Sequence, residues 1–348
     1  MTLKDSLLWP LTLPYGAVSH LRARAYSTGV LKQQQLDGIV ISVGNLTTGG
    51  TGKTPMVLWI AGRLAAEGKS VGILTRGYRG ETSSQNAPPK EASSAEGSES
   101  TSDEVQLLKS RLGDCVAFGV GADRFARGQE LARRGVKWFV LDDGFQHLQL
   151  ARDVDIVMID ATNPFGGGHL LPAGRLREPK TALARASMVV VTRSNHSPAV
   201  EAAVRRDSDA PIFYARAELD SVFAPYHPHL TEQDARGKKL FAFCGIGNPP
   251  AFIADLRNWG FQVAGHKFYP DHHRYSPEDV RDIESAARSV GADGVICTEK
   301  DSFNCPGRWA SVDLWVCAIS LRVEREDDFW RTMMRLAETR KAGRTRSK

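Results

Sequence analysis

The chain has 348 residues, of which 42% are hydrophobic and 24% are charged, which is the composition of a folded globular protein. At this length two domains that share a cleft are expected, and the five widely spaced cysteines argue against a disulfide framework or a zinc site and indicate a cytoplasmic protein. No apolar run approaches the roughly 20 residues that cross a bilayer, so a membrane-spanning protein is not expected. The formal charge of +5 is concentrated in the C-terminal segment, so nucleic-acid binding is not expected either.

The first predicted element is a helix near the N-terminus. Val18, Leu21 and Ala25 recur at helical spacing, and Arg22 and Arg24 lie beside them. Such a helix can lie at a membrane interface or pack on its own domain, and the pattern fits both. Contact with a membrane surface is therefore one of two open possibilities.

Strand and helix patterns alternate between residues 38 and 192. Short apolar, β-branched runs are typical of strands that are buried on both faces of a sheet. Because helix-like stretches separate these runs, the sheet is predicted to be parallel and doubly wound, in an α/β fold of the P-loop NTPase type. The runs cover residues 38–43, 71–74, 138–141, 154–159 and 188–192, with helical patterns at 54–67 and 124–134.

A second set of strands indicates a smaller α/β domain. Its apolar runs lie at residues 239–243, 294–297 and 314–319. A segment of the first domain that is rich in Ser, Glu, Pro and Ala lacks apolar periodicity, which predicts a mobile loop. The predicted division is 1–210 for a P-loop kinase and acceptor-binding domain with the mobile loop at 81–102, 211–237 for a hinge, 238–330 for the smaller domain, and 331–348 for a helix end and a solvated basic tail.

The strongest motif is a glycine-rich loop directly after the first buried strand. Gly-Gly-Thr-Gly-Lys-Thr between a strand and a helix is the context of a phosphate-binding P-loop, although Thr47 stands where the motif usually begins with glycine. Lys53 is expected to neutralise the β and γ phosphates of ATP, and the Thr54 hydroxyl to bind Mg²⁺. The predicted nucleotide-binding residues are Thr47, Thr48, Gly49, Gly50, Thr51, Gly52, Lys53 and Thr54.

Two adjacent carboxylates end another buried strand. Asp142 and Asp143 follow Phe139-Val-Leu, and the carboxyl edge of a parallel sheet faces the nucleotide cleft. Either acid can hold Mg²⁺, directly or through water, as the acid of a Walker B motif does. Helix capping or turn formation is the alternative role for these side chains.

Together, several motif blocks resemble one family, the tetraacyldisaccharide 4'-kinases of lipid A assembly. The resemblance covers most of the chain and includes the threonine at position 47. It implies transfer of the γ-phosphate of ATP to the 4' hydroxyl of tetraacyldisaccharide 1-phosphate, which gives lipid IVA, on the cytoplasmic face of the inner membrane and without an obligate protein partner. It also implies two α/β lobes joined by a short β ribbon. The blocks are Trp9-Pro-Leu, residues 44–55, Thr75-Arg-Gly-Tyr, Ser102-Asp-Glu, residues 142–147, residues 170–179, Asp271-His-His-Arg-Tyr and Thr298-Glu-Lys-Asp.

The resemblance also implies roles for individual residues. Asp103 is linked to catalysis with a histidine that corresponds to His272, and we hypothesise that Asp103 accepts the proton of the acceptor hydroxyl while His272 orients it. Ser102 and Val105 replace a glycine and a proline of the family's pattern. The other predicted site residues are Lys53 for catalysis, Thr54, Asp142, Asp143 and Glu104 for Mg²⁺, and Asn45, Arg76, Gln146, His147, Arg175 and Arg177 for the substrate.

Two other functions remain open, a P-loop regulatory switch that binds a protein partner and a kinase of a soluble metabolite. The block at residues 298–301 loosely resembles a guanine-reading Lys-x-Asp motif, but its Lys and Asp are adjacent, which argues against a guanine-dependent switch. Arg175 and Arg177, which lie in a loop rich in Gly and Pro, have two possible roles. They can clamp phosphate or form ordinary surface ion pairs, and the sequence fits both roles.

Overall fold

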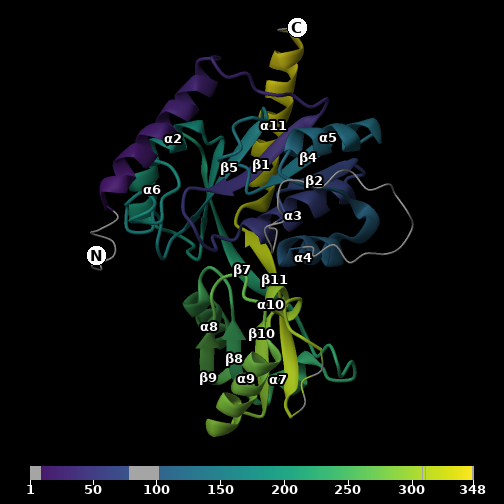
Figure 1. Cartoon of the computed structure of the whole chain (residues 1–348). Helices are drawn as coiled ribbons and strands as arrows, with labels where there is room; N and C mark the ends of the chain where they lie inside the picture. The colour runs from purple at the N-terminus through teal and green to yellow at the C-terminus, as the bar shows by residue number, and fades with distance from the viewer. Residues whose placement is uncertain (1–8, 78–101, 308, 310, 347–348) are drawn as a thin grey trace, which may run out of the picture.

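The computed structural model describes residues 9–77, 102–307, 309 and 311–346. In this part of the chain, strands form one mostly parallel sheet in the order β3-β2-β4-β1-β5-β6-β7-β11-β10-β8-β9. Figure 1 shows a larger lobe and a smaller lobe, which β7 and β11 connect. The predicted α/β fold with a parallel, doubly wound sheet is confirmed.

The strands of the larger lobe arise from the predicted apolar runs. Every residue of β1 (Ile39–Asn45) and β5 (Val154–Asp160) is buried, because helices cover both faces of the sheet. The other strands are β2 (Val71–Thr75), β3 (Ala117–Val120), β4 (Trp138–Asp142) and β6 (Met188–Thr192). The helices are η1 (Trp9–Leu11), α2 (Thr12–Ser27), α3 (Lys53–Ala66), α4 (Asp103–Leu112), η2 (Gly113–Cys115), α5 (Arg124–Arg133), η3 (Lys180–Arg185), α6 (Pro198–Arg205) and α11 (Glu326–Arg346).

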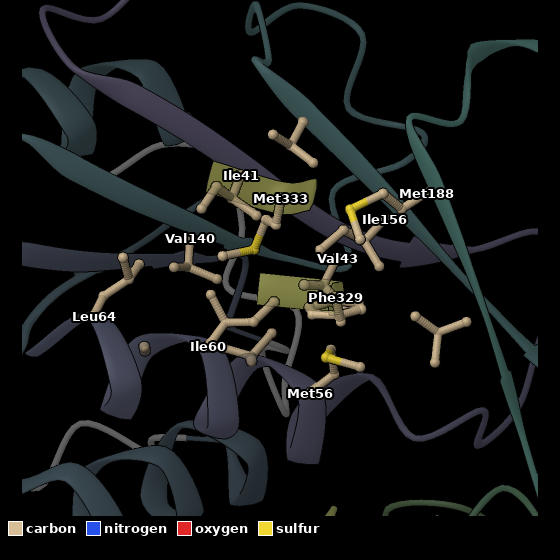
Figure 2. Close-up of a cluster of buried hydrophobic side chains, with 14 of the residues drawn as sticks. Ile41, Val43, Met56, Ile60, Leu64, Val140, Ile156, Met188, Phe329 and Met333 are labelled. Carbon is tan, nitrogen blue, oxygen red and sulfur yellow. The ribbon is translucent and has the colours of Figure 1, made fainter. Parts of the chain in front are cut away.

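The largest hydrophobic core lies between this sheet and the helices α3, α4 and α11. Ile41 and Val43 of β1 pack in one cluster with Met56 and Ile60 of α3, and Phe329 of α11 joins them (Figure 2). Truncation of one large side chain in such a core costs about 2–5 kcal/mol. The packed core therefore fixes the positions of the ends of β1 and β4, from which the next loops begin.

The smaller lobe repeats this layered arrangement. Its parallel strands are β8 (Lys239–Cys244), β9 (Gln262–Phe268) and β10 (Gly294–Thr298). Side chains of α7 (Glu232–Arg236) and α8 (Pro249–Asn258) cover one face, those of α9 (Pro277–Ser289) cover the other, and α10 (Glu299–Ser302) follows β10.

Two long strands connect the lobes. β7 (Ile212–Phe223) leads into the smaller lobe, and β11 (Asp313–Val323), which pairs with it antiparallel, leads back. Phe329 and Trp330 of α11 then enter the core of the larger lobe. The predicted range of 238–330 for the smaller domain therefore extends too far at its C-terminal end, because β11 returns the chain before residue 329.

The predicted mobile loop at 81–102 lies outside the described residues except for Ser102, whose hydroxyl accepts a hydrogen bond from the Val105 N–H at 3.4 Å and caps α4. The predicted basic tail instead continues α11 to Arg346, because Ala, Arg and Lys are favourable helix residues. Across the described ranges, no helix has the length and apolar content to cross a membrane.

Candidate active site

The glycine-rich loop connects β1 to α3. Gly49 and Gly52 have φ angles of 117° and 85°, in the left-handed region that favours glycine. Gly52 is the N-cap of α3, so the positive end of the helix and its first N–H groups face the loop. This local sequence builds the N-terminal anion site that a phosphate requires.

Lys53 is the first residue of α3 and lies between the ends of two strands. Its Nζ is 3.3 Å from Oδ1 of Asn45 and 3.6 Å from Oδ1 of Asp143. Asn45 also donates to the Gly49 carbonyl at 3.4 Å, and Gln146 Nε2 donates to the Asn45 carbonyl at 2.9 Å. The lysine is therefore held in place by a network that joins β1, the loop and the end of β4.

Asp142 and Asp143 lie at the end of β4 with different proton affinities. Burial, together with the carboxylates of Glu104 and Asp143, raises the pKa of Asp142 to about 7. Burial also opposes the ionisation of Asp143, but Lys53 and Arg177 outweigh it and keep the pKa of Asp143 below its usual range. Asp143 is therefore the more acidic of the two, whereas Asp142 holds its proton more tightly and releases it more readily when a cation approaches.

The oxygen atoms at this edge of the sheet suit Mg²⁺. Oδ1 of Asp143 is buried and accepts no hydrogen bond, although the Lys53 ammonium lies 3.6 Å away, and Asp142 and Thr54 add oxygen ligands on the same cleft wall. Within the described ranges, no three His, Cys, Asp or Glu residues form a complete metal cage. This donor set fits a cation that takes its other ligands from water and from substrate phosphates. Glu104, the fourth predicted ligand, lies 3.7 Å from the Lys300 ammonium.

Asp103 and His272 come from different lobes and meet at the cleft. Nδ1 of His272 lies 3.0 and 3.1 Å from the two carboxylate oxygens of Asp103. This hydrogen bond raises the pKa of His272. Burial alone would raise the pKa of Asp103, but His272 and Lys300 lower it. The Asp103 side chain is 4% exposed and the His272 side chain is 34% exposed, so the histidine is the more accessible member of the pair.

The segment at residues 170–179 crosses the P-loop. Nη2 of Arg175 donates to the Thr48 carbonyl at 2.8 Å, and the Thr48 N–H donates to the Arg175 carbonyl at 2.8 Å. Arg177 donates to Oδ2 of Asp143 at 2.7 Å. Arg175 thus supports the backbone of the phosphate loop, whereas Arg177 supports the acid beside it.

Cationic groups surround His147 on the cleft wall. Burial and the charge of Arg124 lower the pKa of His147 to about 4, so this imidazole is neutral at pH 7. Arg124 is 6% exposed, and its Nη1 donates to the Asp143 carbonyl at 3.4 Å. Burial lowers the pKa of Arg124, and the positive charge of nearby Arg76 lowers it further. This grouping suits an anionic ligand.

One cleft of about 1010 Å³ brings together residues of both lobes. Tyr15, Val18 and Arg22 of α2 form part of its wall, beside the predicted residues of the larger lobe. Of the predicted site residues, Thr48, Gly49, Gly50, Thr51, Gly52, Lys53, Thr54, Arg76, Glu104, Asp142, Asp143, Gln146, His147, Arg177 and His272 line the cleft, whereas Asn45, Thr47, Asp103 and Arg175 are not on its wall.

Several residues at the site were not predicted for it. Lys300 lies in the block at residues 298–301, which belongs to the family resemblance but gave no predicted site residue. Asn304, which donates to Asp103 at 3.2 Å, follows that block without a motif of its own. Gly247 packs on the P-loop so closely that a Cβ there would lie 2.1 Å from the nitrogen of Gly50. The Gly-Ile-Gly sequence after β8 was the available signal for this contact.

Residues 4–338 match the family model described as Tetraacyldisaccharide-1-P 4'-kinase (LpxK). A tetraacyldisaccharide 4'-kinase of Geobacter metallireducens is 40% identical over 307 residues, which cover 85% of this chain and 87% of the relative. One of Anaeromyxobacter sp. is 37% identical over 333 residues, which cover 92% and 89%. The crystal structure of "apo" form LpxK from Aquifex aeolicus in complex with ATP is similar with a TM-score of 0.69 and 27% identity, over 96% of this chain and 99% of that one. The chain therefore belongs to the tetraacyldisaccharide-1-phosphate 4'-kinase family.

Proposed function

We propose that this chain uses ATP and Mg²⁺ to phosphorylate the 4' hydroxyl of a tetraacyldisaccharide 1-phosphate, which yields lipid IVA. Family membership supports the acceptor, and the ATP in the Aquifex aeolicus structure supports the nucleotide. The observation that carries the proposal is that one cleft has Lys53 on its larger-lobe side and His272, paired with Asp103, on its smaller-lobe side. Donor and acceptor can meet between these groups.

On the donor side, the larger lobe binds and polarises the triphosphate. The N–H groups of the P-loop and the Lys53 ammonium contact phosphate oxygens. Lys53 is already positioned by Asn45 and Asp143, so little reorganisation is needed when the phosphates enter. Thr54, Asp142 and Asp143 would hold Mg²⁺, which would neutralise part of the charge on the β and γ phosphates.

On the acceptor side, His272 is the group that faces the substrate. Asp103 is almost fully buried behind it, so the geometry favours a division of roles opposite to the one predicted from the resemblance. Nε2 of His272 accepts the hydroxyl proton, and Asp103 holds the Nδ1–H, as in the triads of hydrolases. The acceptor oxygen bonds to the γ phosphorus while the bond from phosphorus to the bridging oxygen of ADP breaks.

The acyl chains of the acceptor need an apolar surface, and α2 offers one. Of its 16 residues only Thr12 is buried, whereas Leu13, Val18 and Leu21 are 66%, 65% and 64% exposed. Val18 also lines the cleft. A helix packed on its own domain would bury these side chains, so the exposure favours the interfacial alternative. In this proposal α2 lies on the cytoplasmic surface of the inner membrane.

The test is transfer of label from [γ-³²P]ATP to purified tetraacyldisaccharide 1-phosphate in detergent micelles with Mg²⁺. Label should move to the lipid with the wild type and with a control variant at the exposed surface, Lys32→Met, but not with Lys53→Met. Hydrolysis at one rate with and without lipid would instead support a regulatory switch. Equal transfer to a soluble disaccharide without acyl chains would support a metabolite kinase, and either result would refute the proposal.

A further inference from the structure

The block at residues 298–301 joins the smaller lobe to α4, the helix that begins with Asp103. Thr298 ends β10, and its hydroxyl caps α10. Asp301 is 1% exposed and accepts hydrogen bonds from the Gly245 N–H at 2.7 Å and from the Tyr275 hydroxyl at 2.8 Å. These contacts fix the two residues between Thr298 and Asp301, whose side chains extend across the lobe boundary.

Glu299 and Lys300 contact opposite ends of α4. Oε2 of Glu299 is 2.9 Å from Nε of Arg111 in the last turn of the helix. Nζ of Lys300 is 3.7 Å from Oδ2 of Asp103 and 3.7 Å from Oε1 of Glu104, in the first turn. Ion pairs therefore connect the short helix α10 to both the first and the last turn of α4.

Lys300 also contacts the turn that carries His272. Its Nζ is 3.4 Å from Oδ1 of Asp271, the residue before His272. The Lys300 side chain is 18% exposed, so this ammonium sits among three carboxylates with limited access to water. Charges at such distances interact far more strongly there than in bulk water. Without the ammonium, Asp103, Glu104 and Asp271 would repel one another.

The other partners of Asp103 do not replace this charge. Its carboxylate accepts hydrogen bonds from Asn304 Nδ2 at 3.2 Å and from the Glu104 N–H at 2.9 Å, and both donors are neutral. His272 itself is the group whose orientation is at stake. Lys300 thus supplies a permanent cation that touches one partner of the pair and the neighbour of the other.

We propose that Lys300 is a positioning residue for the Asp103–His272 pair, holding Asp103 on one side and Asp271 on the other so that the His272 ring faces the cleft. This inference rests on the proposed function. In this role the ammonium does not bind phosphate, and its removal should affect the transfer step rather than substrate binding.

The experiment compares Lys300→Met with Glu299→Gln, which removes the other α10 to α4 ion pair without touching Asp103. For Lys300→Met we expect kcat to fall at least 10-fold, with KM for ATP and for the lipid within about 3-fold of wild type. Glu299→Gln should keep kcat within about 3-fold. A normal kcat in Lys300→Met, a loss expressed in KM for ATP, or an equal loss in Glu299→Gln would overturn the proposal.

A double variant adds a second criterion. Groups that act as a unit are not additive, so Lys300→Met should cause little further loss in the Asp103→Ala background. Losses that multiply would show that Lys300 acts independently of the pair.

A third measurement does not depend on lipid phosphorylation. Long-range ¹H–¹⁵N spectra should show His272 with its proton on Nδ1 in wild type and in Glu299→Gln, and a mixture of tautomers in Lys300→Met. An unchanged His272 spectrum in Lys300→Met would overturn the positioning role even if the wild type proved inactive on the lipid. Conversely, a wild type that fails to phosphorylate the lipid but shows the tautomer change would refute the proposed function alone.

Discussion

Gly247, where the smaller lobe packs on the P-loop, allows a test of how closely the lobes must approach. A Cβ at this position would lie 2.1 Å from the nitrogen of Gly50 and 2.9 Å from Cα of Gly49. Both are backbone atoms of a loop that Arg175 supports, so they cannot rotate aside as a side chain could. Gly247 does not have a positive φ, so Gly247→Ala adds this steric contact without backbone strain of its own.

The size of the effect follows from the contact distance. An ordinary contact begins at 3.4 Å, so the smaller lobe must retreat by about 1.3 Å. If His272 moves back with the lobe, its 3.0 Å bond to Asp103 lengthens beyond hydrogen-bond range. Since a displacement of roughly 1 Å can cost up to about 100-fold in rate, we expect kcat to fall by 10- to 100-fold, to order of magnitude.

The assay measures kcat at saturating ATP and lipid, with the melting temperature as a control for folding. Gly237→Ala is the matched control, because its added Cβ would meet nothing closer than 3.8 Å. A folded Gly247→Ala variant with wild-type kcat would refute the argument that close lobe contact is needed. So would an equal loss in Gly237→Ala.

Three further predictions concern the donor site, the pair and the membrane. Lys53→Met should lower kcat by about 10³-fold or more without lowering the melting temperature, because the lysine acts on transferring charge rather than on the core; a folded variant that keeps its turnover would exclude the P-loop role. Asp103 raises the pKa of His272 above the ordinary value of about 6.5, so kcat/KM should fall as the pH decreases through this raised pKa. In Asp103→Asn, the midpoint of His272 in an NMR titration should move to lower pH, and an unchanged midpoint would contradict the pairing. The double substitution Val18→Ser and Leu21→Ser should weaken sedimentation with anionic vesicles by at least about 10-fold, since each buried apolar side chain contributes roughly 1.5–3 kcal/mol; equal binding would place the contact elsewhere.

The phosphate site could be predicted because its parts are neighbours in the chain. A buried strand, two glycines that need positive φ and a lysine at a helix start all lie between Ile39 and Thr54, and each leaves a local pattern. The strand alternation of the larger lobe is local in the same sense. Such features depend on secondary-structure periodicity and backbone sterics, which can be read without knowing the tertiary structure.

The acceptor side could not be derived in this way. Asp103 and His272 are 169 residues apart, and only the family resemblance paired them. Their relative exposure, which decides the member that faces the cleft, results from the packing of two lobes and has no local pattern. The contacts of Lys300, Asn304 and Gly247 are of the same kind, because each depends on where the smaller lobe meets the larger one.

The path of the chain also bears on the order in which it can fold during synthesis. The smaller lobe is a continuous insertion between β7 and β11, whereas the larger lobe needs Phe329 and Met333 of α11 to complete the core cluster that contains Ile41. Because the N-terminal part leaves the ribosome first, the face of β1 that α11 covers stays open to water until α11 emerges. The second lobe can thus be complete before the first. A stop codon shortly after β11 would damage the nucleotide-binding half, which was made earliest, more than the half that was made last.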